Sequence, residues 1–244
     1  MIISGLQKLT LIDYPGKLAC TVFFSGCNFR CPWCYNPELV LIEKKEKDKI
    51  TEKEFFDFLR ERKNLLEGVV LGGGEPTVNP ELIEFCKKIK TIGYSVKLDT
   101  NGSNFEMLKN LINKNLIDYV ALDVKAPKEK YLKIIGIEAQ FSGLKSIFWK
   151  ERIIKNVEKS INLLKEGKID YEFRTTVIPT LLEKKDILKI ARWIRPDKKY
   201  FLQNFRPEKT IDPKFEKIKP YSEEYLLGIQ KAIAPFFDIC QIRG

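Results

Sequence analysis

Histidine is absent from this chain of 244 residues. Any metal site must therefore use thiolate, carboxylate, backbone or cofactor ligands, and no imidazole is available as a catalytic base. Long hydrophobic runs are also lacking, because no apolar stretch approaches the roughly 20 residues that span a membrane. The N-terminal sequence MIISGLQKLTLIDYPGK has no basic start followed by an apolar stretch and a small-residue cleavage site. We therefore expect no signal peptide, no membrane association and a cytoplasmic location.

Acidic residues are outnumbered in this sequence. Lysine and arginine number 43 against 33 aspartates and glutamates, which gives a formal net charge of +10. A basic surface attracts acidic partners such as nucleic acid, phosphate-rich ligands or an acidic electron carrier. The charges are interspersed along the chain, however, and no basic stripe alternates with aromatic residues. Nucleic acid is therefore not a favoured partner.

The sequence does contain a repeated alternation of short buried strands with amphipathic helices. We expect six strands, at residues 18–25, 68–73, 94–100, 119–124, 170–178 and 199–205. Helices are expected at residues 51–66, from Asn79 and Pro80 onward, at 104–115, 149–164 and 183–194, and after Ser222. Thr51 and Glu54 would form a capping box at the start of the first helix. This alternation predicts an α/β fold of parallel units, either a barrel or an open sheet, with the active site at the C-terminal strand ends. Because no linker divides the chain, residues 1–244 are expected to form one domain.

Three of the six cysteines lie close together after the first predicted strand. Cys27, Cys31 and Cys34 are spaced Cys-x-x-x-Cys-x-x-Cys within a loop at residues 26–36. Three thiolates on one loop can bind three corners of a cubane cluster and leave the fourth iron open to a substrate. The alternative is a structural zinc or a fully ligated cluster, which needs a fourth ligand from Cys20, Cys86 or Cys240. Cys20 and Cys86 are better explained as small buried side chains, which leaves Cys240 as the serious fourth candidate.

Polar and glycine-rich segments follow several of the other strands. Gly72, Gly73 and Gly74 precede Glu75 at the end of the second strand, where glycine would let the backbone approach a ligand. Asp99 ends the third strand and Asp123 the fourth, so both carboxylates would point into the same mouth. Two carboxylates so placed need a cation or protonation. Turn formation and helix capping by residues 99–102 is the simpler alternative.

These motifs together resemble those of the radical S-adenosylmethionine superfamily. Within it, the chain is most similar to the activating enzymes of glycyl radical enzymes, in particular the anaerobic ribonucleotide reductase and pyruvate formate-lyase activating group, over nearly its whole length. The resemblance implies a partial (β/α)6 barrel that holds a 4Fe–4S cluster on Cys27, Cys31 and Cys34. It also implies reductive cleavage of S-adenosylmethionine to methionine and a 5′-deoxyadenosyl radical, which takes hydrogen from a glycine of a partner enzyme. No acid or base catalyst is needed for that chemistry, which suits a chain without histidine.

The resemblance also implies roles for particular residues. The matching positions for S-adenosylmethionine are Trp33, Tyr35, Gly73, Gly74, Glu75, Lys125, Arg174 and Gln203. The pyruvate formate-lyase activating branch makes a ribose contact with a histidine that this chain lacks, so Gln203, Asn204 or Arg206 would replace it here. A monovalent cation would lie between Asp99, Thr100, Asp123 and the backbone carbonyl of Leu122. Asp13, in the segment IDYPGK, matches a contact to the partner's glycine loop, although a plain turn at Pro15 and Gly16 explains the segment equally well.

The expected partners are a glycyl radical enzyme and, as electron donor, an acidic ferredoxin or flavodoxin. Two other functions remain open at this point. One is a radical S-adenosylmethionine enzyme that acts on a small molecule or RNA. The other is a non-catalytic iron–sulfur or zinc-binding protein.

Overall fold

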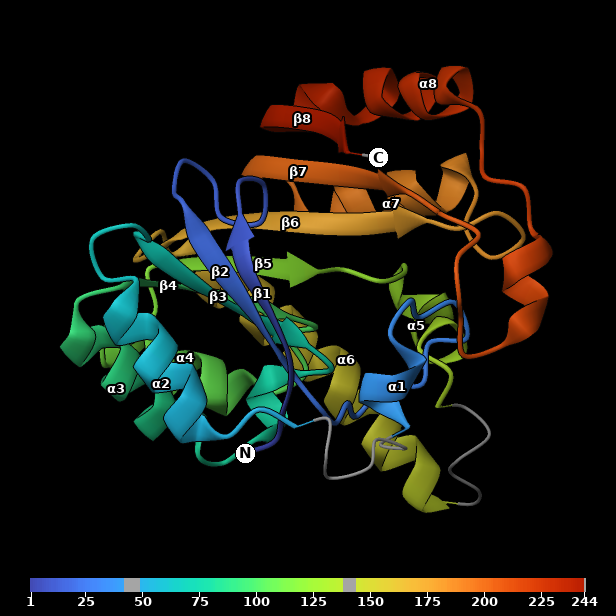
Figure 1. Ribbon diagram of the computed structural model, residues 1–244. Coiled ribbons are helices and arrows are strands. Elements are labelled where there is room, and N and C mark those ends of the chain that lie inside the picture. The colour runs from blue at the N-terminus through green and yellow to red at the C-terminus, as the bar shows by residue number, and fades with distance from the viewer. Residues whose placement is uncertain (42–48, 138–143, 244) are drawn as a thin grey trace.

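The computed structural model describes residues 1–41, 49–137 and 144–243, with side chains described except at residues 144–150. Within these residues the chain forms one eight-stranded sheet in the order β1 to β8 (Figure 1). β1 runs antiparallel to β2, and every later neighbour is parallel. The strands are β1 Ile3–Thr10, β2 Ala19–Phe24, β3 Gly68–Gly73, β4 Ser95–Thr100, β5 Tyr119–Asp123, β6 Asp170–Val177, β7 Asp197–Asn204 and β8 Phe237–Arg243.

The six predicted strands correspond to β2 through β7, so the prediction of parallel β/α units is confirmed. The two edge strands, β1 and β8, were not predicted. Both are partly exposed, with residues such as Lys8 in β1 and Asp238 in β8 open to solvent, so neither shows the buried run that marks the inner strands. The edges of the sheet are not paired with each other, so the curved sheet is a partial barrel rather than a closed one.

Eight α-helices connect or flank the strands in the described residues. They are α1 Pro37–Val40, α2 Glu52–Glu61, α3 Leu82–Ile92, α4 Phe105–Asn113, α5 Tyr131–Ile134, α6 Leu144–Lys165, α7 Lys184–Ile194 and α8 Glu223–Ile233. The capping box of Thr51 and Glu54 is present at the start of α2. This helix ends at Glu61 rather than near residue 66, because the chain turns after Arg62 and leaves Leu65 exposed.

The start of α3 differs from the prediction that Asn79 and Pro80 open the helix. Residues Pro76–Val78 form a short 3-10 turn, and α3 begins only at Leu82. The Asn79 side chain donates back to the carbonyl of Pro76 at 3.2 Å instead of capping α3. The Glu75 carboxylate caps the 3-10 turn by accepting from the Thr77 amide at 3.1 Å.

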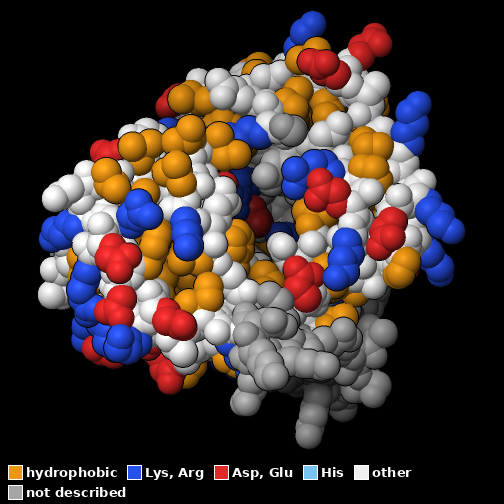
Figure 2. All heavy atoms as spheres, viewed as in Figure 1, with side chains coloured by type: hydrophobic (Ala, Val, Ile, Leu, Met, Phe, Trp, Pro, Cys, Tyr) orange, Lys and Arg blue, Asp and Glu red, His pale blue; other side chains and the backbone are white. Residues whose placement is uncertain are grey.

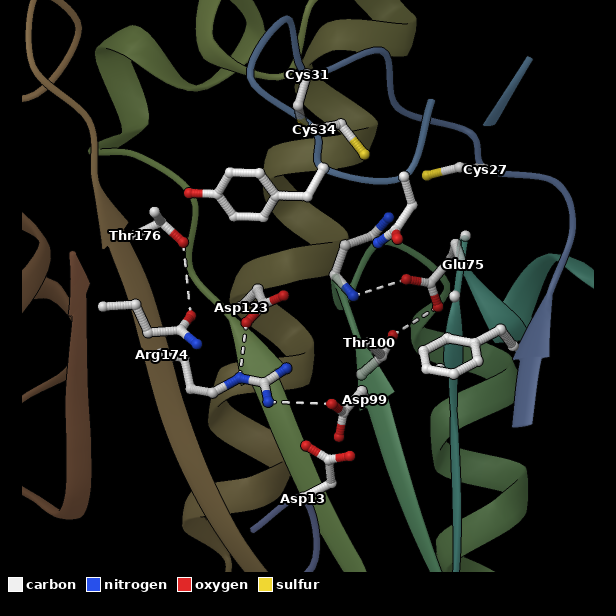
Figure 3. A pocket seen from close by; sticks show the side chains of 18 of the residues that line it. Asp13, Cys27, Cys31, Cys34, Glu75, Asp99, Thr100, Asp123, Arg174 and Thr176 are labelled. Carbon is white, nitrogen blue, oxygen red and sulfur yellow. Dashed lines mark hydrogen bonds and ion pairs between the residues drawn. The ribbon is translucent and has the colours of Figure 1, made fainter. Parts of the chain in front are cut away.

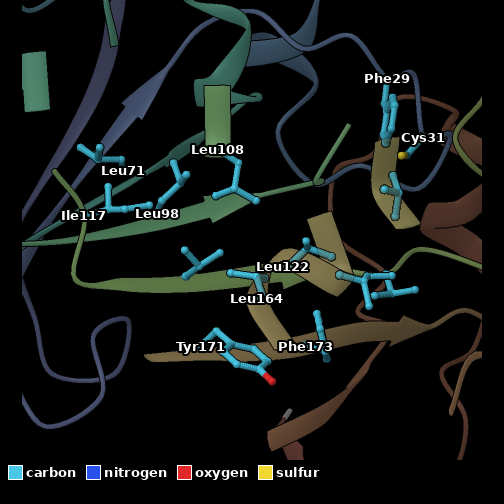
Figure 4. Packing of buried hydrophobic residues seen from close by; sticks show 14 of the residues in the cluster. Phe29, Cys31, Leu71, Leu98, Leu108, Ile117, Leu122, Leu164, Tyr171 and Phe173 are labelled. Carbon is cyan, nitrogen blue, oxygen red and sulfur yellow. The ribbon is translucent and has the colours of Figure 1, made fainter. Parts of the chain in front are cut away.

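The two faces of the parallel strands differ in chemistry. Outward-facing residues are aliphatic or aromatic and are buried beneath the helices, as Figure 4 shows for Leu71, Leu98, Leu122 and Phe173. Inward-facing residues, one position away along each strand, include Thr21, Lys97, Asp99, Glu172 and Arg174. Because side chains alternate along a strand, each strand therefore contributes an apolar side to the core and a polar side to the inner space of the barrel, hereafter the lumen.

The IDYPGK segment lies at the N-terminal ends of the parallel strands. Its turn is present, with the Lys17 amide donating to the Tyr14 carbonyl at 3.2 Å. Tyr14 is buried against Ala19, Val70 and Tyr119. A Cβ at Gly68 would lie 2.8 Å from the Tyr14 ring, so the absence of a side chain there makes room for the tyrosine. Across the described residues, no helix combines the length and apolar character needed to cross a membrane.

Candidate active site

The lumen contains a cavity of about 540 Å³ that extends to the loops at the C-terminal strand ends. Figure 2 shows the hollow on the surface, with charged side chains inside it. Most of the residues predicted from the sequence line this one cavity. They are Asp13, Cys27, Cys31, Trp33, Cys34, Tyr35, Gly73, Gly74, Glu75, Asp99, Thr100, Asp123, Lys125, Arg174 and Gln203. The Leu122 side chain instead packs in the core outside the lumen (Figure 4).

The loop that carries the three cysteines is fixed to the barrel by backbone contacts. The Gly26 carbonyl accepts from the Glu75 amide at 2.8 Å, and the Arg30 amide donates to the Ile135 carbonyl at 2.8 Å. The Arg30 guanidinium folds back to donate to the carbonyl of Cys27 at 2.6 Å. These contacts hold the loop between β3 on one side and the segment after α5 on the other.

The three thiols of this loop are free and largely enclosed. Burial raises the pKa of Cys27 and of Cys31 to about 12, and burial also raises the pKa of Cys34. Iron must therefore displace the protons when it binds, which is the usual chemistry of thiolate ligands. Figure 3 shows the sulfurs of Cys27 and Cys34 facing the same space above the charged residues.

The other three cysteines do not line the cavity. Cys20 and Cys86 are fully buried in the hydrophobic core, as expected, and Cys240 lies on β8. In the part of the chain with described positions, no group of three or more cysteine or acidic side chains is close enough to hold a single metal ion. A cubane cluster makes a different demand, because each of its thiolates binds a separate iron.

The glycine segment has two different structural roles. β3 pairs with β2 as far as Gly73 but with β4 only as far as Leu71, so Gly72 and Gly73 have no strand partner on the β4 side. Gly72 faces the cavity, and a Cβ there would meet nothing within 4 Å. At Gly74 a Cβ would lie 2.0 Å from the Gly26 carbonyl oxygen, so Gly74 is required by the contact with the cysteine loop.

Glu75 is buried at the end of this segment, and its carboxylate is occupied by the protein. It accepts from the Thr100 hydroxyl at 2.7 Å, from the Asn101 amide at 2.7 Å and from the Thr77 amide at 3.1 Å. These bonds join the loop after β3 to the loop after β4. A buried carboxylate with several donors is a stable cross-link, because each donor compensates part of its desolvation.

Five charged residues form one connected group in the lumen, hereafter the lumen charge network: Lys97, Asp99, Asp123, Lys125 and Arg174. Arg174 donates to Asp99 at 3.0 Å and to Asp123 at 2.9 Å, which joins the two carboxylates (Figure 3). Lys125 pairs with Asp123 at 3.1 Å, and Lys97 pairs with Asp99. The network thus links β4, β5 and β6 below the cysteine loop.

The network keeps Asp123 ionised. Burial alone would raise the pKa of Asp123, but Arg174 and Lys125 outweigh it and lower that pKa to about 2. A depressed carboxyl pKa means that the stabilisation is present above the unfolded-state pKa of about 4 and is lost only as the pH falls toward 2. Lys125 shows the opposite balance. Burial alone would lower its pKa, but the neighbouring Asp123 outweighs burial and raises that pKa.

Aromatic residues close the cavity next to the cysteines. The Trp33 ring is buried, with the Lys125 ammonium 5.3 Å from its centroid. Its indole nitrogen has no hydrogen-bond partner although it is buried. Tyr35 stacks on Phe205 at 6.0 Å and accepts from the Arg206 amide through its hydroxyl at 2.9 Å. Gln203 accepts from the Thr176 hydroxyl at 3.5 Å on the same wall.

Lys97 and Gly136 are among the residues of this site that the sequence did not identify. Lys97 is buried in the lumen, and the signal for it was its position two residues before Asp99 in the same strand. Gly136 has a backbone φ of +69° and supports the cysteine loop, since a Cβ there would lie 1.8 Å from the Arg30 carbonyl oxygen. No local pattern pointed to Gly136, because its contact joins residues that are far apart in the sequence.

Known proteins are similar to this chain in sequence along most of its length. A family model described as the radical SAM superfamily matches residues 21–194. A curated protein of Methanocaldococcus jannaschii, described as a putative glycyl-radical enzyme activating enzyme, is 34% identical over 99% of this chain and 95% of its own length. The pyruvate formate-lyase-activating enzyme of Clostridium pasteurianum is 26% identical, and the alignment covers 79% of this chain and 76% of that protein.

Solved structures agree on the fold. SuiB of Streptococcus suis, bound to its precursor peptide SuiA, matches with a TM-score of 0.63 and 14% identity over 92% of this chain. This chain spans only 48% of SuiB. TYW1 with a lysine–pyruvate adduct matches with a TM-score of 0.57 and 17% identity, covering 89% of this chain and 73% of TYW1. These likenesses confirm the expected partial barrel.

The fold and the lumen define an α/β protein of the partial-barrel class, with its candidate site at the C-terminal ends of a parallel sheet. The match to the family model identifies the family: the chain belongs to the radical S-adenosylmethionine superfamily. The cofactors of that family are a 4Fe–4S cluster and S-adenosylmethionine. The chain offers features that suit both, namely three free thiols on one loop, an unpartnered buried indole N–H beside them and a glycine backbone with no strand partner on the β4 side.

Proposed function

We propose that this protein is an activating enzyme that generates a radical on a glycine of a partner enzyme. The observation that carries the proposal is the placement of the three cysteines directly above the lumen charge network, in a chain that matches an activating-enzyme relative along its whole length. When bound, the cluster and S-adenosylmethionine supply an electron and a 5′-deoxyadenosyl radical that takes hydrogen from the glycine. The protein's task is to bind, orient and shield these groups.

The cysteine loop would hold the cluster. Cys27, Cys31 and Cys34 are the ligands we assign, and the loop needs no fourth protein ligand from the described cysteines. The unpartnered Trp33 N–H lies beside this loop and is available to an acceptor on the bound groups. The enclosed position of the thiols would exclude water from the cluster.

The lumen wall would bind S-adenosylmethionine. Lys125 and Arg174 are the partners we assign to the methionine carboxylate, since both are partly buried cations that line the cavity and arginine pairs well with carboxylates. The backbone of Gly72 and Gly73, which has no strand partner on the β4 side, suits the methionine ammonium. Glu75 would keep that backbone in place, while Trp33, Tyr35 and Gln203 provide the wall for the adenosine.

The partner's glycine loop would enter past the turn between β1 and β2. Asp13 lines the cavity and accepts from the Thr21 hydroxyl at 2.8 Å, which fixes its carboxylate toward the lumen. The residues next to it are strongly exposed, with Leu11 at 68% and Ile12 at 85% of their full exposure. An exposed apolar pair at the rim of a cavity suits contact with a polypeptide.

The proposal is tested under anaerobic conditions with the reconstituted, reduced protein and S-adenosylmethionine. We expect 5′-deoxyadenosine to form, and a glycyl radical to be detected by electron paramagnetic resonance when pyruvate formate-lyase or anaerobic ribonucleotide reductase is added. Cys31→Ala should abolish both signals, whereas Cys86→Ala, which changes a core cysteine outside the cavity, should retain them. Cleavage without a glycyl radical on either protein would point to a different substrate, and equal cleavage by Cys31→Ala would refute the cluster assignment.

Asp13→Asn separates partner binding from cofactor chemistry. The amide retains an oxygen that can accept from Thr21 but removes the charge at the cavity rim. We expect the rate of glycyl radical formation to fall about tenfold while S-adenosylmethionine cleavage without partner is unchanged. Asp238→Asn, at an exposed position on β8, is the control. A parallel loss of both activities would assign Asp13 to the cofactor site instead.

A further inference from the structure

The three side chains expected to hold a monovalent cation already have partners within the protein. The two oxygens of Asp99 accept from Lys97 and from Arg174, the latter at 3.0 Å. The two oxygens of Asp123 accept from Arg174 at 2.9 Å and from Lys125 at 3.1 Å. The Thr100 hydroxyl donates to Glu75 at 2.7 Å and accepts from the Gly102 amide at 3.1 Å. These side chains therefore do not fit a metal ion as they stand.

Within the lumen charge network, Lys97 is the residue to which the proposed function gives no role. It lies two residues before Asp99 on β4, so both side chains project into the lumen. Its side chain is only 1% exposed, and its ammonium forms an ion pair with Asp99. A lysine is seldom buried so completely unless its charge is paired, which makes the Lys97–Asp99 pair a specific feature of this lumen.

The charge balance of the lumen charge network also leaves no need for an added cation. Lys97, Lys125 and Arg174 supply three positive charges, and Asp99 and Asp123 supply two negative charges. The surplus of one positive charge is the counter-charge for the methionine carboxylate, while the ammonium and the sulfonium of S-adenosylmethionine would lie elsewhere in the cavity. A metal ion would double this surplus among groups in direct contact with one another, where like charges repel.

We propose that the Lys97 ammonium takes the place of a monovalent metal ion beside Asp99, so that this protein binds S-adenosylmethionine without an alkali-metal ion. Lys97 is a positioning residue: its charge holds Asp99, which in turn orients Arg174 toward the cofactor. The inference rests on the proposed binding of S-adenosylmethionine in this cavity, but it does not depend on which partner is activated.

The test measures binding of S-adenosylmethionine to the cluster-loaded protein by equilibrium dialysis in potassium, sodium or choline chloride at constant ionic strength. The wild-type dissociation constant should agree within about twofold in the three salts. Lys97→Met keeps the length of the side chain but removes the charge. It should bind about tenfold more weakly in choline chloride and recover in potassium or sodium chloride, since the vacated site can then take a metal ion. Lys90→Met, which breaks a lysine–aspartate pair outside the lumen, should behave as the wild type.

A second readout has a wild-type arm that does not depend on the variant at all. Crystals of the wild-type holoenzyme soaked in thallium(I) should show no anomalous peak between Asp99 and Asp123, whereas crystals of Lys97→Met should show one. The inference is overturned if the wild type binds thallium there, if its affinity for S-adenosylmethionine falls in choline chloride, or if folded Lys97→Met is indifferent to the salt. Wild type that binds S-adenosylmethionine in no salt would instead refute the proposed function as well.

Discussion

Gly136→Ala should prevent assembly of the 4Fe–4S cluster while the sheet remains folded. A Cβ at this position would lie 1.8 Å from the carbonyl oxygen of Arg30, an overlap that one of the two backbones must relieve. Gly136 also has a φ of +69°, a conformation that alanine adopts only with strain. Because Arg30 lies between Cys27 and Cys31, the displacement would move the cluster ligands themselves. We expect the iron content per chain after reconstitution to fall at least about tenfold, as is typical when the support of metal ligands is lost.

Gly74→Ala provides an independent test from the other side of the same loop. Its Cβ would lie 2.0 Å from the Gly26 carbonyl oxygen, directly before Cys27. The control is Gly228→Ala, since that glycine lies in α8 and a Cβ there would meet nothing within 4 Å. Iron content and the visible absorption of the cluster are measured for each variant, with circular dichroism as the check on folding. Full iron content in both Gly136→Ala and Gly74→Ala would show that the loop is not fixed by these contacts.

These glycines illustrate why the sequence revealed the ligands but not their support. Cys27, Cys31 and Cys34 lie within eight consecutive residues, so their spacing carries the information locally. Gly136 acts through a residue more than 100 positions away, and only the folded chain brings the two together. The strand–helix alternation is likewise local, because each buried strand and amphipathic helix has its own pattern. For this reason β2 through β7 could be predicted, while the partly exposed edge strands β1 and β8 could not.

The charged residues show a second limit of sequence reasoning. The positions of Asp99 and Asp123 at strand ends correctly placed them in the same lumen. Which partners would neutralise them was not evident, because pairing depends on strand order and register. In the sheet, Asp123 is the register partner of Arg174, and Asp99 is the register partner of Ala121. That arrangement lets one guanidinium reach both carboxylates, and it makes Arg174 the centre of the lumen charge network.

Arg174→Met should reduce both the stability of the protein and its affinity for S-adenosylmethionine. The change leaves Asp99 and Asp123 with one lysine each, so we expect the free energy of unfolding to fall by about 3 kcal/mol, the lower end for breaking a buried ion pair. It also removes a cation assigned to the methionine carboxylate. A buried charge pair contributes enough that the dissociation constant should rise about 100-fold.

Arg243→Met is the matched variant that separates these two effects. Arg243 pairs with Glu172 at 2.8 Å, and Glu172 is only 1% exposed, so this variant also leaves a buried carboxylate without its cation. Glu172 lies two residues before Arg174 on β6, on the side of the lumen away from the cysteine loop. We therefore expect a loss of stability of similar size, about 3 kcal/mol by chemical denaturation, with S-adenosylmethionine affinity within about twofold of the wild type. If both variants lost affinity equally, Arg174 would act through the stability of the barrel rather than through contact with the cofactor.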